Sequence, residues 1–95
     1  MINMNAISDS ARPQLAKGVR LQIDSITGKC VLLYPEGILE LNETANDILS
    51  RCDGRSVAEI VHELAEQYDV DANALSADVV ETLTNVHQRK LIELT

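Results

Sequence analysis

The sequence has no tryptophan and no phenylalanine, and its only aromatic side chains are those of Tyr34 and Tyr68. A hydrophobic core must therefore be aliphatic, and 45% of the 95 residues are hydrophobic. A chain of this length is expected to form one domain. It buries too small a fraction of its surface to enclose a deep catalytic cavity as well.

Cysteines are also scarce, and Cys30 and Cys52 have neither a close cysteine partner nor a histidine at the spacing of a zinc site. We therefore expect no metal and no cofactor, and interpret both thiols as reduced, buried side chains. No apolar run approaches the roughly 20 residues of a membrane span, and the first residues lack the apolar centre of a signal peptide. The sequence therefore predicts a cytoplasmic protein with no membrane partner.

Basic residues are few, and the formal net charge is −7. Residues 1–34 hold four basic and two acidic side chains, or +2, so the remainder of the chain carries −9. A protein that binds duplex DNA needs a basic stripe that neutralises phosphates. No such stripe exists, and a nucleic-acid partner is not expected.

Catalytic groupings are missing as well. The two histidines, His62 and His87, have no nucleophile beside them, and no glycine-rich phosphate loop is present. The carboxylates of Glu59, Glu63 and Glu66 recur at the spacing of a solvated helix face. The sequence therefore predicts a protein that is not an enzyme.

The start of the chain has no periodic pattern. Residues 1–15 are polar and interrupted by Pro13, which is typical of a flexible arm. Residues 16–95 are then expected to form the single domain. Alternation of apolar and polar side chains begins at Val19 and predicts a strand over residues 19–24.

Two further strands are predicted, over residues 29–34 and 38–41, with turns at Thr27-Gly28 and at residues 35–37. Together the three segments predict an antiparallel sheet. In the third strand, Leu39 and Leu41 are expected to face inward and Glu40 outward.

Three helices are predicted after the sheet. Asn42 is a favourable N-cap for the first, which Gly54 is placed to end. Ser56 and Glu59 match a capping box at the start of the second. Asp71 or Ser76 caps the third. The buried helix stripes are expected at Ala45, Ile48, Leu49, Cys52, Val57, Ile60, Val61, Leu64, Leu75, Val79, Leu83 and Val86.

This order, β-β-β-α-α-α, is an α+β fold. Three strands are too few to close a barrel, so at least one edge of the sheet stays open. An open edge can accept an extended peptide as an added strand. The pattern alone leaves two alternatives equally open, packing of the edge on the chain's own helices and pairing of edges in a homodimer.

The segment from Leu32 to Ala45, LLYPEGILELNETA, resembles the signature of the pyrroloquinoline quinone (PQQ) biosynthesis protein D family. Arg12-Pro13, Leu15 and residues 18–21 resemble the opening of that family. Ile48-Leu49, residues 52–57 and Glu59-Ile60 resemble its junction between the first and second helices. The resemblance spans roughly residues 12–92. One departure is Lys90-Leu91-Ile92, where members often carry an aromatic after a basic residue.

The resemblance implies a winged helix-turn-helix-like domain that binds the PQQ precursor peptide. It also implies delivery of that peptide to a radical S-adenosylmethionine enzyme, which cross-links a glutamate and a tyrosine of the peptide and carries the cofactor. In such elements the peptide adds beside the third strand, against the third helix. Carried onto this chain, the peptide-binding residues are Gly37, Ile38, Leu39, Glu40, Leu41, Val79, Val80, Leu83 and His87.

Two other functions remain as alternatives. A helix-turn-helix-like transcriptional regulator would use a similar arrangement on DNA, but the charge of −9 over the helical part of the chain argues against it. A structural homodimer through strand or arm exchange is compatible with peptide binding. A monomer is the expected state.

Overall fold

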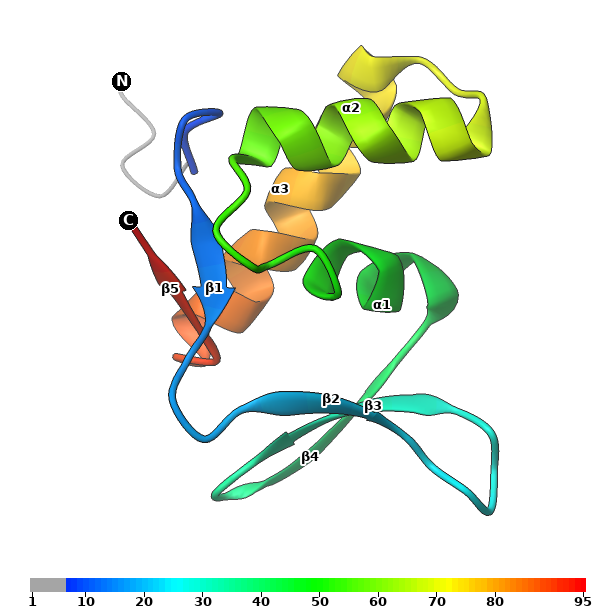
Figure 1. Cartoon of the computed structure of the whole chain (residues 1–95), viewed down its shortest axis with the longest axis vertical. Coiled ribbons are helices and arrows are strands. Elements are labelled where there is room, and N and C mark those ends of the chain that lie inside the picture. The colour runs from blue at the N-terminus through cyan, green and yellow to red at the C-terminus, as the bar shows by residue number, and fades with distance from the viewer. Residues whose placement is uncertain (1–6) are drawn as a thin grey trace.

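The computed structural model describes residues 7–95 as an α+β fold (Figure 1). In chain order the elements are β1 (Pro13–Leu15), β2 (Arg20–Ile23), β3 (Cys30–Tyr34), β4 (Gly37–Leu41), α1 (Glu43–Leu49), α2 (Val57–Tyr68), α3 (Ala72–Gln88) and β5 (Ile92–Leu94). The expected order of three strands followed by three helices is confirmed by β2 to α3. β1 and β5 are additions to it.

The three-stranded sheet has the order β2-β3-β4 and is antiparallel throughout. Its second turn is a tight hairpin in which Tyr34 pairs with Gly37, so only Pro35 and Glu36 lie between the strands. At the first turn, the Asp24 carboxylate accepts a hydrogen bond from the Ile26 N–H at 2.8 Å, and Gly28 has a positive φ of 74°. The residues at these two turns therefore fix the register of β2 with β3 and of β3 with β4.

The flexible arm expected over residues 1–15 is corrected at its C-terminal part, and residues 1–6 lie outside the described residues. β1 pairs with β5 in a second, two-stranded antiparallel sheet, and the Pro13 side chain is fully buried. Proline is tolerated in this strand because Pro13 and Leu94 form a pair without main-chain hydrogen bonds, so the missing N–H of Pro13 is not needed. The ordered unit therefore begins before residue 16.

The helix starts follow the predicted capping residues. The Asn42 side chain accepts from the Ala45 N–H at 2.7 Å, and Ser56 and Glu59 form the complete capping box. Asp71, rather than Ser76, caps α3. Gly54 does not end α1, which stops at Leu49. Instead, Gly54 lies in the following loop at φ 105°, with its N–H donated to the Pro13 carbonyl at 3.3 Å.

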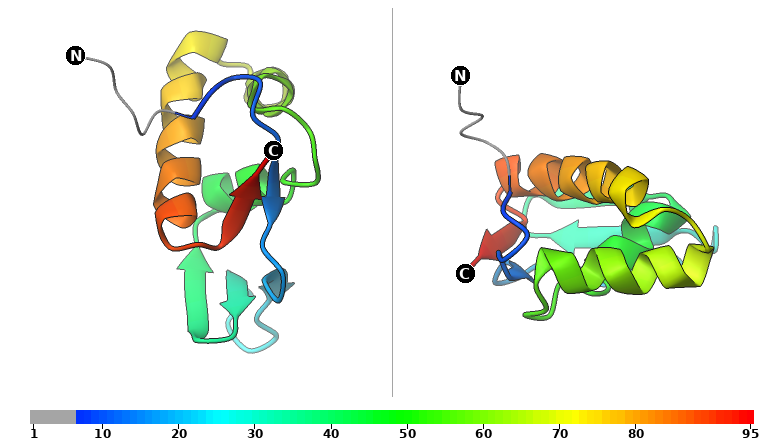
Figure 2. Two further views of the ribbon diagram at one scale, coloured as in Figure 1. Left: turned by 90° about the vertical axis from the view of Figure 1, so that its left-hand side faces the viewer. Right: turned by 90° about the horizontal axis from the view of Figure 1, so that it is seen from above.

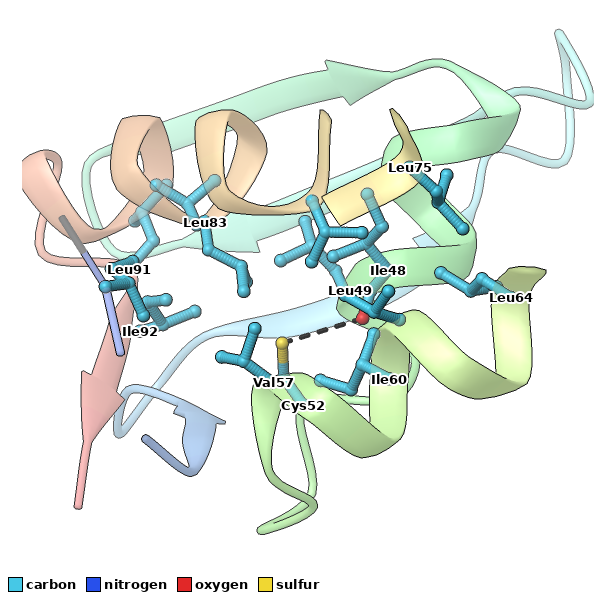
Figure 3. Packing of buried hydrophobic residues seen from close by; sticks show 14 of the residues in the cluster. Ile48, Leu49, Cys52, Val57, Ile60, Leu64, Leu75, Leu83, Leu91 and Ile92 are labelled. Atoms are coloured by element: carbon cyan, nitrogen blue, oxygen red, sulfur yellow. Dashed lines mark hydrogen bonds between the residues drawn. The ribbon is translucent and has the colours of Figure 1, made fainter. Parts of the chain in front are cut away.

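The core is aliphatic and lies between the helices and the inner face of the sheet (Figure 3). Cys52, just beyond α1, is buried with its Sγ 3.6 Å from the Ile48 carbonyl oxygen. The largest fully buried side chains are Leu32, Ile48, Leu49, Ile60, Leu64, Leu83, Val57, Val79 and Pro13. Apart from Pro13 and Leu32, all of these belong to the predicted helix stripes.

Contacts with α1 join the sheet to the helices, because α1 contacts both β3 and β4. α2 lies on the other side of α1 from the sheet, and α3 packs against both α1 and α2, as the two turned views show (Figure 2). No helix within residues 7–95 is long and apolar enough to cross a membrane. In this arrangement β4 is an edge strand on the same side of the molecule as α3.

Candidate functional site

The outer edge of β4 has no strand beside it within the described residues. Which backbone groups it exposes follows from the ladder between β2 and β3. The Asp24 N–H donates to the Lys29 carbonyl at 2.8 Å, so this pair is hydrogen-bonded. Hydrogen-bonded and non-bonded pairs alternate along an antiparallel ladder. Val31 and Leu33 are therefore the β3 residues that bond to β2.

The other residues of β3 bond to β4, where their partners are Gly37, Leu39 and Leu41. The intervening residues, Ile38 and Glu40, direct their N–H and C=O groups away from β3. β4 thus presents two donors and two acceptors along a free edge. This is the main-chain pattern that an added strand requires.

The side chains of β4 alternate as the sequence predicts. Leu39 and Leu41 are half-buried and pack against the core, whereas Ile38 is 64% exposed. The Glu40 carboxylate lies on the outer face, 3.2 Å from the Lys29 ammonium. One side of the edge is therefore apolar and faces the helices.

A groove of about 330 Å³ separates this apolar side from α3. α1 forms its floor through Ala45 and Leu49. Its full lining is Leu39, Leu41, Ala45, Leu49, Thr82, Asn85, Val86 and Arg89. We refer to this hollow as the β4–α3 groove. An extended segment placed along β4 would lie with alternate side chains over it.

Of the predicted β4 residues, Leu39 and Leu41 line the groove, and Ile38 and Glu40 lie along the open edge. None of the predicted α3 residues lines the groove. Val79 and Leu83 are fully buried in the core. Val80 lies two positions before Thr82, about 200° around the helix at roughly 100° per residue, and His87 lies about 140° from Thr82 on the same measure. Peptide contact with Val80 or His87 stays a prediction, which the position of the groove does not favour.

The α3 residues that do line the groove are Thr82, Asn85, Val86 and Arg89. Asn85 and Val86 follow Thr82 by three and four positions, and Arg89 follows them by four and three, so all four share a face. Val86 belongs both to this face and to the buried stripe. The only signal for the groove in the sequence is that Thr82, Asn85 and Arg89 are polar residues that border the buried stripe beside Val86.

Three shifted pKa values have structural causes. Burial, followed by the nearby charge of Asp53, raises the pKa of the Cys52 thiol to about 12. Burial, followed by a hydrogen bond from the Tyr68 hydroxyl to the Asp47 carboxylate, raises the pKa of Tyr68 to about 12. The Ser56 N–H bond lowers the pKa of Glu59. In each case the shift follows from packing or helix capping.

Metal ligands do not gather in this structure: within residues 7–95 no three His, Cys, Asp or Glu side chains form a group that could hold an ion. The α3 surface beside the groove carries Asp78 and Glu81 as well as Arg89. Carboxylates in this position repel nucleic-acid phosphates. The geometry therefore offers main-chain hydrogen bonds and apolar contacts.

A family model described as Coenzyme PQQ synthesis protein D (PqqD) matches residues 29–92, which include all of β4 and α3. The chain belongs to the PqqD family. A relative from Xanthomonas axonopodis pv. citri (strain 306), named PqqA binding protein, is 44% identical over 92 residues. The PqqA binding protein of Xanthomonas euvesicatoria pv. vesicatoria (strain 85-10) is 42% identical over the same length. Both alignments cover 96% of this chain and 100% of the relative.

Two solved PqqD structures are similar to this fold. The solution NMR structure of the PqqD truncation of Methylobacterium extorquens PqqCD has a TM-score of 0.81 at 35% identity and covers 94% of this chain and 96% of the other. It is described as a functional, stand-alone recognition element for ribosomally synthesized and post-translationally modified peptides. The crystal structure of PqqD from Xanthomonas campestris has a TM-score of 0.57 at 37% identity and covers 96% of this chain and 97% of the other.

Proposed function

We propose that this protein binds the PQQ precursor peptide, PqqA, as an added strand on β4 and presents it to the radical S-adenosylmethionine enzyme that cross-links it. The observation that carries the proposal is the free β4 edge beside the β4–α3 groove. Ile38 and Glu40 offer main-chain groups there, and Leu39 and Leu41 offer an apolar wall. In strand addition the main-chain hydrogen bonds give affinity, and the contacts of alternate side chains with the apolar wall give specificity.

Membership of the PqqD family supports this proposal. Full-length relatives are named for binding PqqA, and the Methylobacterium structure is described as a recognition element. The matches to these proteins cover nearly the whole chain, so they include the edge strand and the helix that form the groove.

The protein acts by binding and orienting, and the bond-forming chemistry belongs to the partner enzyme. An extended peptide held on β4 has a fixed register, because its side chains alternate between the groove and solvent. Residues outside the bound segment remain accessible to the enzyme. Holding a substrate in one orientation is itself a large part of what a modification reaction needs.

We place this function in the cytoplasm. Cys30 and Cys52 are both free thiols in the structure, one half-buried and the other buried. Free thiols of this kind persist in a reducing compartment.

The strand-addition mode can be tested with a matched pair of variants at Glu40, whose N–H faces the open edge. Glu40→Pro removes that N–H, and an edge strand tolerates proline on its outward side. Glu40→Ala keeps the N–H, and both variants lose the ion pair with Lys29. We expect Glu40→Pro to weaken PqqA binding about tenfold relative to Glu40→Ala, measured by calorimetry.

A heteronuclear NMR titration of the parent with PqqA gives the direct readout. The amides of Ile38 and Glu40 should shift, and the mass of the peptide should stay unchanged after incubation with the protein alone. Equal binding by the proline and alanine variants would rule out strand addition at this edge. Saturable binding of duplex DNA would favour a regulator, and a concentration-dependent dimer that excludes PqqA would favour a structural module.

A further inference from the structure

The β4–α3 groove does not end with β4. A second hollow of about 260 Å³ follows along α3 and is lined by Asn42, Thr44, Asp78, Glu81 and Thr82. It shares Thr82 with the β4–α3 groove. A third hollow of about 390 Å³ lies at the turn between α2 and α3 and shares Thr44 and Asp78 with the second. The three hollows therefore adjoin one another in a row along α3, and we call this row the channel.

The third hollow, which we call the far hollow, is lined by Thr44, Tyr68, Val70, Ala74, Leu75 and Asp78. Leu75 is buried, and Val70 is 48% exposed although it is apolar. The Tyr68 hydroxyl is held by the Asp47 carboxylate, so the aromatic ring is fixed in place. An aliphatic floor, a fixed ring and an exposed valine suit an apolar side chain.

The charges along the channel are separated. Arg89 lies at the β4 end, and Asp78 and Glu81 line the middle hollow. A peptide that follows the channel would match these charges with a basic side chain over Asp78 and Glu81 and an acidic one near Arg89. Complementary charges of this kind select both partner and register.

The length of the channel sets the length of peptide needed. Ala74 and Arg89 are 15 residues apart on and just beyond α3, or about 22 Å at 1.5 Å per residue. An extended peptide covers this distance with about seven residues. β4 runs opposite to α3 along the channel, since Leu41 lies beside residues of the C-terminal end of α3 and Thr44 beside Asp78. A peptide antiparallel to β4, the more stable pairing, therefore passes the far hollow first.

We propose that the far hollow is a second subsite, which takes an apolar side chain of the same precursor peptide, N-terminal to the strand on β4, with a basic residue between them over Asp78 and Glu81. This inference rests on the proposed function. It assigns the peptide a direction, a minimum length and an order of side-chain types: apolar, basic, then the alternating strand.

The first test uses isotope-labelled protein, the full-length PqqA peptide and PqqA peptides shortened stepwise from the N-terminus. With the full peptide, the amides of Val70 and Ala74 should shift together with those of Ile38 and Glu40. Shortening should remove the shifts at Val70 and Ala74 first. If only the β4 amides shift, the proposed function stands and the second subsite is refuted. If neither set shifts, the proposed function fails.

The second test uses variants at exposed positions. Ala74→Trp fills the far hollow, and we expect about tenfold weaker binding of full-length PqqA, the value of one buried apolar side chain. The same variant and the parent should bind the shortened peptide equally well, because that peptide lacks the side chain that would enter the far hollow. Val70→Ser removes the apolar wall and should give a smaller loss in the same direction. Equal affinity of both variants and the parent for full-length PqqA would overturn the proposal.

A charge reversal tests the middle of the channel. Glu81→Lys should weaken binding of full-length PqqA roughly fivefold, as expected for one exposed ion pair turned into repulsion. Glu66→Lys is the matched control, because Glu66 is equally charged and 72% exposed but lies on α2 outside the channel. If the Glu81→Lys variant binds full-length PqqA as tightly as the Glu66→Lys control, the peptide has no basic residue over Asp78 and Glu81.

Discussion

The carbonyl oxygen of Ala11 accepts a hydrogen bond of 2.9 Å from the N–H of Val57, the first residue of α2. The Asp9 carbonyl accepts from the next N–H, that of Ala58, at 3.0 Å. The first N–H groups of a helix have no partner within the helix. The segment before β1 thus completes the N-terminal cap that Ser56 begins, and it ties the start of the chain to α2.

This attachment predicts a large effect of a charge at Pro13, whose side chain is fully buried beside β5. We expect Pro13→Asp to lower the free energy of unfolding by about 3 kcal/mol or more, because it leaves a buried carboxylate unpaired. Ser10→Asp, an exposed change in the same segment, should alter it by less than about 0.5 kcal/mol. Urea unfolding monitored by circular dichroism measures both. Similar stabilities for the two variants would mean that the segment is not docked in solution.

The capping box predicts a defined pH dependence. The hydrogen bond from the Ser56 N–H, 2.9 Å long, holds the pKa of Glu59 below its ordinary value of 4.5. Since the folded pKa is lowered, the stabilisation is complete above the unfolded value and is lost as the pH falls through the folded one. Glu59→Gln keeps the acceptor but does not titrate. Its unfolding free energy should therefore fall less steeply than that of the parent between about pH 5 and pH 3. Parallel curves would contradict the assignment.

The two thiols should differ in reactivity. The thiolate is the reactive form, and burial raises the pKa of Cys52 to about 12, whereas Cys30 lies half-buried on β3. We expect one thiol per chain to react with a maleimide in the native protein and two in denaturant. Cys30→Ser should abolish the native reaction. Fast native labelling of this variant would show that the core around Cys52 opens readily.

The face of α3 that meets the peptide can be decided with two aspartate substitutions. Thr82→Asp places a charge in the β4–α3 groove and should weaken PqqA binding about tenfold through desolvation of that charge. Val80→Asp, on another face, should leave binding within about twofold. The placement predicted from the sequence gives the opposite order. Calorimetric titration distinguishes the two, with thermal melting as the check that both variants fold.

The sequence was sufficient where the pattern is local. Alternation identified β2, and the turns at Thr27-Gly28 and residues 35–37 delimited β3 and β4. Side chains that bond to nearby N–H groups placed the helix starts at Asn42 and Ser56. It was not sufficient for β1 and β5, because three-residue strands far apart in the chain leave no periodic signal. Gly54 was misplaced because α1 ends at Leu49, five residues before the position that needs a positive φ.

The candidate site was predicted in part for a related reason. An open edge follows from the strand count, and the resemblance to the family assigned this edge to Gly37–Leu41, the residues that form β4. The helix residues depend on how α3 is rotated about its own axis, which is set by packing against α1 and α2. Val79 and Leu83 mark the core stripe, and the groove lies on the side of Thr82 instead. The periodicity of apolar residues predicts the buried face of α3, but it does not predict which side of that face borders the groove.

The pairing of β1 with β5 has a consequence for the order in which the molecule assembles. Arg12 and Thr95 exchange backbone hydrogen bonds at 3.1 and 3.3 Å although they stand at opposite ends of the described chain. Closing so long a loop costs more entropy than closing either hairpin, and three-residue strands cannot repay that cost alone. We therefore expect the ends to join last, on a nearly finished core. Because the β4 edge and α3 are formed by residues 37–89, we expect the peptide-binding surface to form before β1 pairs with β5.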